Sequence, residues 1–313
     1  MTATGRLPYL DAETVRSLSM TEAVDALERA LRRGLDPACD PPRTVLDGDV
    51  GQLLVMPSAA AGGFSVKLVS VAPAAAADTG GRTLPRIQGL VVLFDPTTLA
   101  PAALVDGAAL TSVRTPAVSA LAVRHVAHPD ARRLVVFGSG PQAEGHIAAM
   151  AAVRPISDVV VVGRDPGRAA ALAARVAKPG LSCRAGRAAD VADADVVVCA
   201  TTASEPVFDG HLVRDGTCVV AVGSHEPTAR EVDTALVRRS RLVVEETGTA
   251  LREAGDLVLA GVEPDDVTQL ADVVRRSSGS GSEWQADRPT LVKTVGMAWQ
   301  DAVVAAEAVA RLA

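Results

Sequence analysis

The sequence predicts an α/β protein with two domains, one built on a doubly wound parallel sheet and the other with an α+β fold. The 313 residues exceed the usual size of a single core, so about two domains are expected. Short strand-like runs separated by Gly, Pro and Asp occupy residues 44–106. After residue 130, continuous apolar runs alternate with helical segments, as is typical of strands buried on both faces.

The N-terminal part begins with a predicted helix over Thr21–Arg33, where apolar residues recur at helical spacing behind Thr21 as candidate cap. The runs QLLVMP, FSVKLVSV, GLVVLFD and PAALVDG follow, and their turn residues predict a mostly antiparallel sheet. Leu110–Val126 is then predicted to be a helix with a small-residue face, which we interpret as a bridge between the domains.

The later part alternates the apolar runs RLVVFG, DVVVVG, ADVVVCA, TCVVAVG and RLVVEE with helices, one of them over Arg168–Val176. The low-complexity segment SSGSGSEW, residues 277–284, is predicted to be a loop. A final helix over Gly296–Leu312 closes the chain.

Composition excludes several classes of partner. A net charge of -6 without a Lys/Arg-rich run argues against nucleic acid. The apolar stretches are interrupted well before the roughly 18 residues that a membrane span needs. The four cysteines lie far apart without a C-x-x-C pair, and no signal-like segment opens the chain, so a cytoplasmic location is expected.

The stretch LVVFGSGPQAEGH contains the pattern Gly138-x-Gly140-x-x-Ala143 between a buried strand and a helix. The first glycine permits a tight turn, and the second lets backbone approach a pyrophosphate at the N-terminus of the helix. This context predicts a Rossmann domain that binds a dinucleotide. The alternative is a purely structural turn.

The end of the second strand, VVVVGRDPGR, bears on the choice of cofactor. The acidic residue that binds the ribose of NAD is expected there, but Gly163 takes its place and Arg164 follows, with Arg168 one helical turn further. A guanidinium suits a 2′-phosphate, whereas Asp165 is expected only to cap a helix. NADP(H) is therefore preferred and NAD(H) is the second choice. In the alternative, the arginine stacks on adenine without preference.

The assembled motifs resemble those of the ornithine cyclodeaminase/mu-crystallin family of NAD(P)-dependent oxidoreductases. The motifs are VMP (55–57), FSVKLVS (64–70), QGLVVLFDPTTLAPAALVDGAALTSVRTPAVSALA (88–122), FGSGPQAEGH (137–146), VGSHEPTAREVD (222–233), EAGDL (253–257) and TLVKTVGMAWQD (290–301). The resemblance implies a substrate-binding and dimerisation domain from residues 1–125 and 299–313, a Rossmann domain from 126–298, and a homodimer.

The resemblance also implies the site. Lys67, Arg114 and Arg43 would hold the carboxylate of a small amino or imino acid, for which Arg offers a bidentate contact and Lys a point charge. Lys67 lies in an alternating strand and shares a sheet face with Ser65 and Val69. The expected cofactor contacts are Gly138, Ser139, Gly140, Gln142 and Thr115 at the pyrophosphate, Arg164 at the 2′-phosphate, and Met56, Lys293 and Val295 near the nicotinamide.

Two positions depart from the cyclodeaminase pattern. Leu54 stands where cyclodeaminases carry a Glu that holds the amine end of the substrate. His225 stands at their catalytic Asp, where it is either a general acid/base, with Glu226 beside it, or a structural loop residue. His125, His128 and His146 lack metal-ligand spacing, so no metal is expected.

These residues predict an NAD(P)H-dependent reductase of a cyclic ketimine or α-imino acid, or the reverse amino-acid dehydrogenase. The cofactor would carry the hydride, and Lys67 or His225 would supply a proton. The first alternative is an ornithine- or lysine-type cyclodeaminase. The second is a non-catalytic, mu-crystallin-like protein that binds a small molecule.

Overall fold

The computed structural model describes residues 7–59, 62–73, 84–276, 284 and 287–311. The chain divides into two compact units, Met1–Arg114 with Met297–Ala313 and Thr115–Gly296. Helix α3 (Gly107–Val126) runs through the first division, so it contributes to both units. The domain boundary expected at residue 125 lies at the end of this helix, whereas the division by contacts falls within it.

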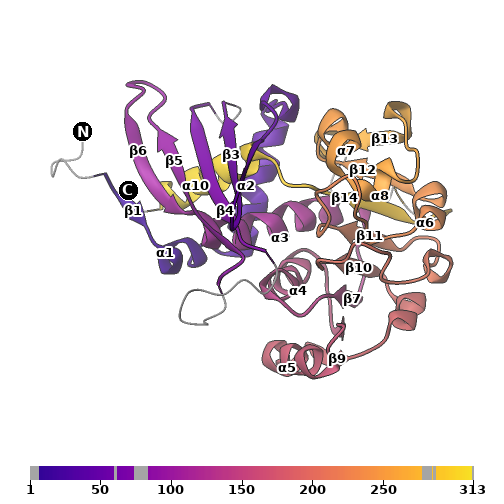
Figure 1. Cartoon of the computed structure of the whole chain (residues 1–313). Helices are drawn as coiled ribbons and strands as arrows, with labels where there is room; N and C mark the ends of the chain where they lie inside the picture. Colours follow the sequence, from indigo (N-terminus) through magenta and orange to yellow (C-terminus); the bar gives the residue numbers. More distant parts are fainter. Residues whose placement is uncertain (1–6, 60–61, 74–83, 277–283, 285–286, 312–313) are drawn as a thin grey trace. The chain divides into compact units, whose positions relative to one another are not determined.

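The first unit contains a six-stranded sheet in the order β1-β6-β5-β4-β3-β2 (Figure 1). Among the strand pairings that the structure describes in this unit, only that of β1 with β6 is parallel, which confirms the predicted mostly antiparallel sheet. The strands are β1 (Tyr9–Leu10), β2 (Thr44–Gly48), β3 (Gly51–Ser58), β4 (Ser65–Val71), β5 (Ile87–Phe94) and β6 (Pro101–Asp106).

Helices cover one face of this sheet. The last helix, α10 (Ala298–Ala310), lies against β3, β4 and β5 and also packs on α2 (Met20–Arg32). Figure 1 shows α10 in yellow behind these strands. The short helices α1 (Ala12–Arg16) and η1 (Pro37–Cys39) complete the described helices of this unit.

The N-terminus of α2 corrects one expectation. Ser19, not Thr21, caps this helix, because Ser19 and Glu22 form a capping box in which each side chain accepts from the other residue's backbone N–H. Thr21 lies inside the first turn. The helix itself, predicted over residues 21–33, is confirmed within one residue.

Side chains alternate strictly along β4. Ser65, Lys67 and Val69 are buried on the face that α10 covers, whereas Leu68 is exposed on the other face. The sequence predicted that these three side chains share a face. Packing by α10 decides that this face is the buried one.

The second unit contains an eight-stranded sheet in which every described pairing is parallel. Its order is β13-β12-β14-β11-β10-β7-β8-β9. As in a Rossmann sheet, successive strands are added outward from β7, with β8 and β9 on one side and β10 and β11 on the other. The predicted doubly wound sheet is confirmed. The strands are β7 (Arg133–Phe137), β8 (Asp158–Val162), β9 (Ser182–Ala185), β10 (Val196–Cys199), β11 (Cys218–Ala221), β12 (Arg241–Val244), β13 (Val267–Gln269) and β14 (Thr290–Lys293).

Helices connect these strands as the alternating pattern predicts. They are α4 (Pro141–Val153), α5 (Pro166–Val176), α6 (Thr234–Arg239), α7 (Thr247–Glu253), α8 (Gly255–Val258) and α9 (Leu270–Arg276), with 3-10 turns η2 (Ala188–Asp193), η3 (Gly210–Leu212) and η4 (Pro264–Asp266). Apart from Trp284, the segment 277–284 lies outside the described residues. None of the helices in the described ranges has the length and apolarity to cross a membrane.

Candidate active site

The carboxyl ends of the parallel strands form a candidate cofactor site in the second unit. The strand order reverses between β7 and β10, and ligands of doubly wound sheets bind at such a point. Gly138, directly after β7, has φ +120°, and a Cβ there would lie 2.4 Å from the Ala200 oxygen that follows β10. Only glycine fits this close approach of two backbones.

At Gly140, in contrast to Gly138, the backbone has open space beside it. A Cβ at Gly140 would have no atom within 4 Å. Gly140 is the N-cap of α4 and provides no side-chain hydrogen bond to the first turn. The first N–H groups and the positive dipole end of a 13-residue helix therefore face a site that suits a phosphate.

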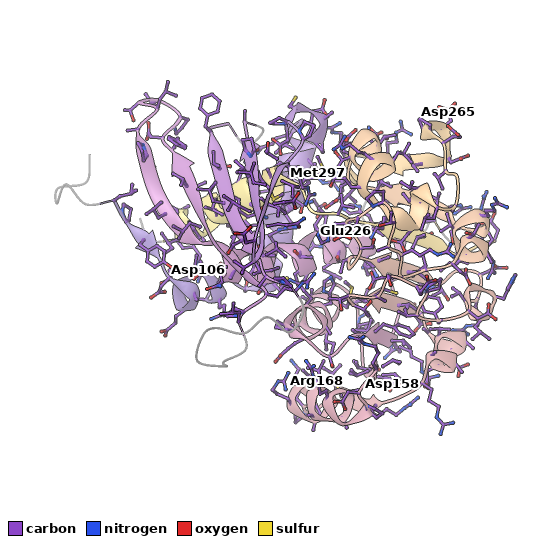
Figure 2. The ribbon with its side chains drawn as sticks, in the orientation of Figure 1. Asp106, Asp158, Arg168, Glu226, Asp265 and Met297 are labelled. Atoms are coloured by element: carbon purple, nitrogen blue, oxygen red, sulfur yellow. The ribbon has the colours of Figure 1, made fainter. Side chains whose placement is uncertain are left out.

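The residues expected to select the cofactor lie after β8. Ser139 Oγ would be 3.7 Å from a Cβ at Gly163, so the turn after β7 lies beside the end of β8. Asp165 caps α5 by accepting from the N–H groups of Gly167 and Arg168, as the sequence predicted. Arg164 and Arg168 are exposed, and Figure 2 labels Arg168 on α5.

The loop that carries His225 follows β11, and the side chain of a buried lysine holds its backbone. Lys293 Nζ lies 3.0 Å from Asp256 Oδ2 and donates to the Ser224 oxygen at 2.7 Å and the Ala221 oxygen at 3.3 Å. The Lys293 side chain, predicted to contact the cofactor, is fully buried in these contacts within the second unit. His225 is partly buried, and Glu226 beside it is exposed (Figure 2).

Two buried carboxylates that the sequence did not single out hold the same loops. Glu231 accepts from the N–H groups of Thr201 at 2.7 Å and Gly223 at 2.6 Å, which joins the loops after β10 and β11. Asp256 Oδ1 accepts from the N–H groups of Glu231 and Val232. Burial raises the pKa of Glu231, although Lys293 opposes that change.

The segment after β14 is fixed by its backbone. Glu245, at the end of β12, accepts from the N–H groups of Val295 at 2.7 Å and Gly296 at 3.0 Å. Gly296 has φ +79°, a conformation that favours glycine. The predicted cofactor segment Lys293–Gly296 is therefore a fixed turn at the carboxyl edge of the sheet.

The first unit contains a candidate site of its own, a buried cluster of charges. Lys67 Nζ donates to Asp301 Oδ2 at 2.7 Å, and Arg114 Nε donates to Asp301 Oδ1 at 3.1 Å. Arg114 Nη1 also donates to Gln300 Oε1 at 3.0 Å. Lys67 and Asp301 are 3% and 1% exposed, so this carboxylate joins two predicted substrate-binding cations away from solvent.

The pKa of Lys67 is lowered to about 8 in this cluster. Burial is the main cause, and Arg114 and Arg43 lower the pKa further, while Asp301 opposes them. Arg43, partly buried just before β2, is thus within electrostatic range of Lys67. The structure therefore joins Lys67 and Arg114 through Asp301, with Arg43 close enough to lower the pKa of Lys67.

Apolar side chains adjoin the cations on the same sheet face. Met56 is paired with Lys67 across β3 and β4, and Leu54, Met56 and Ala298 form a small buried cluster. Leu54 is 7% exposed, so an apolar group occupies the position where cyclodeaminases have a carboxylate. Thr115 and Gln142, two further predicted cofactor contacts, are partly buried residues of α3 and α4 in the second unit.

The parallel sheet, with its glycine turn and a helix N-terminus that has no side-chain cap at Gly140, defines a Rossmann-type α/β unit, and the antiparallel unit contains a buried cationic cluster. A doubly wound sheet of this kind binds dinucleotides at the switch point. The chain belongs to the ornithine cyclodeaminase/mu-crystallin family, whose model matches residues 9–311. The resemblance noted in the sequence is thereby confirmed.

Known relatives cover nearly the whole chain. Delta(1)-pyrroline-2-carboxylate reductase 2 of Burkholderia ambifaria is 38% identical over 96% of this chain and 94% of its own. Ketimine reductase mu-crystallin of Mus musculus is 32% identical over 95% of both chains. The Thermococcus litoralis Delta(1)-pyrroline-2-carboxylate reductase, solved with NADH and L-proline, is 30% identical with a TM-score of 0.86 over 96% of both chains.

Proposed function

We propose that this protein is an NAD(P)H-dependent reductase of a cyclic ketimine or α-imino acid, or the reverse amino-acid dehydrogenase. The observation that carries the proposal is the buried pair of cations, Lys67 and Arg114, next to apolar side chains. A cyclic imino acid combines an anionic carboxylate with an apolar ring, so it matches both parts of this arrangement. The relatives named as reductases of such compounds support the same substrate class.

Lys67, Arg114 and Arg43 would bind the substrate carboxylate. Arg114 fits a bidentate contact, while Lys67 adds a point charge. The cofactor supplies the hydride that forms the new C–H bond. The imine nitrogen needs a proton, and the cationic surroundings disfavour an iminium ion that is protonated in advance. Lys67, with a pKa of about 8, holds a proton at neutral pH and would give it to this nitrogen, then regain one from solvent.

His225 is the second candidate for the proton donor. Lys293 and Glu231 hold the loop directly before His225, through the Ser224 oxygen and the Gly223 N–H. A fixed loop suits a general acid, but it equally suits a structural histidine. Two substitutions separate these assignments. If Lys67 is the donor, Lys67→Ala would remove both carboxylate binding and the proton. If His225 is the donor, His225→Ala would lower turnover with little change in KM.

The cofactor would lie along the carboxyl edge of the parallel sheet. Gly138, Ser139 and Gly140 would surround the pyrophosphate, with Gln142 and Thr115 as further contacts. Arg164, assisted by Arg168, would bind the 2′-phosphate and so give a preference for NADPH over NADH. Met56, Lys293 and Val295 would lie near the nicotinamide; for Lys293 the contact would come from the backbone, because its side chain is buried elsewhere.

The first unit has an exposed apolar surface through which two copies of the chain would associate. The sheet face opposite α10 exposes apolar side chains on four neighbouring strands, with Leu46 opposite Leu53 and Leu68 opposite Leu90. Each is between 38% and 51% exposed. A continuous apolar sheet face of this kind marks an interaction surface. Its occupant would be the same face of a second copy, which gives a homodimer related by twofold symmetry.

The first experiment measures oxidation of NADPH and of NADH, in parallel, with five- and six-membered cyclic imino acids and with pyruvate plus ammonia or methylamine. Oxidation with one of these is expected, faster with NADPH, and Arg164→Ala should reduce that preference about tenfold or more. Lys67→Ala should abolish turnover while leaving NADPH binding intact, because the two functions belong to different residues.

Two results would point elsewhere. Ammonia release from ornithine or lysine with only catalytic amounts of cofactor would favour the cyclodeaminase, against which Leu54 argues. NADPH binding without oxidation across the whole panel would favour a non-catalytic binder. Full turnover by Lys67→Ala would remove Lys67 from the mechanism.

A further inference from the structure

Asp301 is a buried carboxylate with no role in the reaction derived so far. Its side chain is 1% exposed, and its two oxygens contact two different cations, Lys67 and Arg114. A buried carboxylate is costly unless it is paired and hydrogen-bonded, and this one meets both conditions. The cations come from strand β4 and helix α3, so a single residue of α10 joins three elements.

We propose that Asp301 is a positioning residue that orients Lys67 and Arg114 for a substrate carboxylate and keeps Lys67 protonated in its cationic surroundings. The proposal deepens the function given above and rests on it for the identity of the ligand. Gln300, the neighbouring residue of α10, holds Arg114 at a second nitrogen.

The geometry accounts for the orienting role. An ammonium group has three N–H donors and a guanidinium has five, while a carboxylate only accepts. Asp301 takes one donor from Lys67 through Oδ2 and one from Arg114 through Oδ1, and Gln300 takes a second from Arg114. Two atoms of Arg114 are thereby fixed against the first turn of α10. The remaining N–H groups of both cations then have a defined direction.

The charges around Lys67 account for the second role. Arg114 of α3 and Arg43 before β2 both disfavour its proton, as does burial, and Asp301 of α10 opposes them. Asp40, which follows η1, accepts from Trp299 N–H at 2.5 Å and adds a second acidic group near Asp301. Burial raises the pKa of Asp40. Asp301 is therefore the carboxylate in direct contact with Lys67 that favours the ammonium form.

The lysine content of the chain allows a direct test that needs neither substrate nor turnover. The chain has three lysines, Lys67, Lys178 and Lys293. Lysine labelled with carbon-13 at Cε gives one NMR signal for each, and substitution assigns them. Following the signals against pH in the full-length protein measures the titration of Lys67, with the exposed Lys178 as internal reference.

Asp301→Asn should lower the pKa of Lys67 by about one unit or more, because an opposite charge in contact contributes on that order. Asp301→Glu keeps the charge and should restore most of the shift. Glu307→Gln is the matched control: it removes a carboxylate of the same helix that pairs with Arg29 at a partly exposed position, and it should leave Lys67 unchanged.

A second measurement relates the titration to binding. Calorimetry with pyrrole-2-carboxylate, a planar carboxylate that cannot be reduced at a C=N bond, should show affinity that falls above pH about 8 in the wild type. In Asp301→Asn the fall should begin about one pH unit lower, and affinity at pH 7.5 should drop about threefold, because the protonated fraction of Lys67 falls by that factor. Asp301→Ser serves as a second neutral variant if Asn impairs folding.

The outcomes separate this proposal from the proposed function. A Lys67 signal that titrates at the same pH in the wild type and in both neutral variants would overturn the role of Asp301, whatever the enzyme reduces. A shifted titration in a protein that reduces no imino acid would uphold the effect of Asp301 on Lys67 and overturn the reductase. A uniform loss of affinity at every pH, with the titration unmoved, would indicate a purely structural carboxylate.

Discussion

His146 is a buried residue whose titration should make the stability of the second unit depend on pH. Its ring lies 3.0 Å from Ser119 Oγ and 2.7 Å from the Gln142 oxygen, which links α3 to α4 within the second unit. Burial lowers the pKa of His146 from 6.5 to about 4. The unfolded chain therefore takes up a proton near pH 6.5 that the folded chain takes up only near pH 4.

The free energy of unfolding should fall as pH decreases through this window, from about 6.5 to about 4, by up to about 3 kcal/mol from this residue. Denaturant unfolding of the wild type at a series of pH values measures the slope. His146→Gln removes the titrating group, so its own stability should vary less with pH over the same range. An identical slope in both proteins would assign the acid sensitivity to other groups.

At the scale of elements, the turn between β7 and α4 contains two glycines that are needed for different reasons. Gly138 has φ +120° and no room for a Cβ, whereas Gly140 has φ -95° and open space beside it. Gly138→Ala should destabilise the second unit by about 1–3 kcal/mol or more, because it adds backbone strain and a clash with the Ala200 oxygen.

Gly140→Ala is the matched control, and it should leave stability within about 0.5 kcal/mol. It should instead weaken NADPH binding, because its methyl group would enter the space where a pyrophosphate approaches the backbone. Thermal melts and NADPH titrations of both variants check the pair. Unchanged NADPH affinity in Gly140→Ala would place the cofactor phosphates elsewhere.

At the scale of the whole molecule, the exposed sheet face of the first unit predicts the assembly. Light scattering should give about twice the chain mass of 32.0 kDa at micromolar concentration. Leu68→Asp places a charge at the centre of this face and should shift the mass to that of a single chain. Leu259→Asp changes a similarly exposed leucine of the second unit and should leave the dimer intact. A wild-type protein that remains a single chain at tens of micromolar would contradict the proposed interface.

The sequence by itself determined the two sheets, their parallel or antiparallel character, the glycine turn and the helix that follows it. These features have local causes: residue periodicity, strand alternation and the conformational freedom of glycine. The same local information placed Lys67 with Ser65 and Val69 on one face. The family resemblance, in contrast, implied Arg114 and Arg43 as its companions.

Only the tertiary structure decided which groups compensate the buried charges. Asp301 is 234 residues from Lys67 in the chain, and it reaches Lys67 because α10 packs on the sheet. In the same way, Asp256 and Glu231 meet the loops after β10 and β11 only when the parallel strands are assembled. Periodicity says which side of an element a residue occupies, but the partner across a packed interface depends on how distant elements come together. Burial then lowers the pKa of Lys67, and the charges of Arg114, Arg43 and Asp301 modify that change.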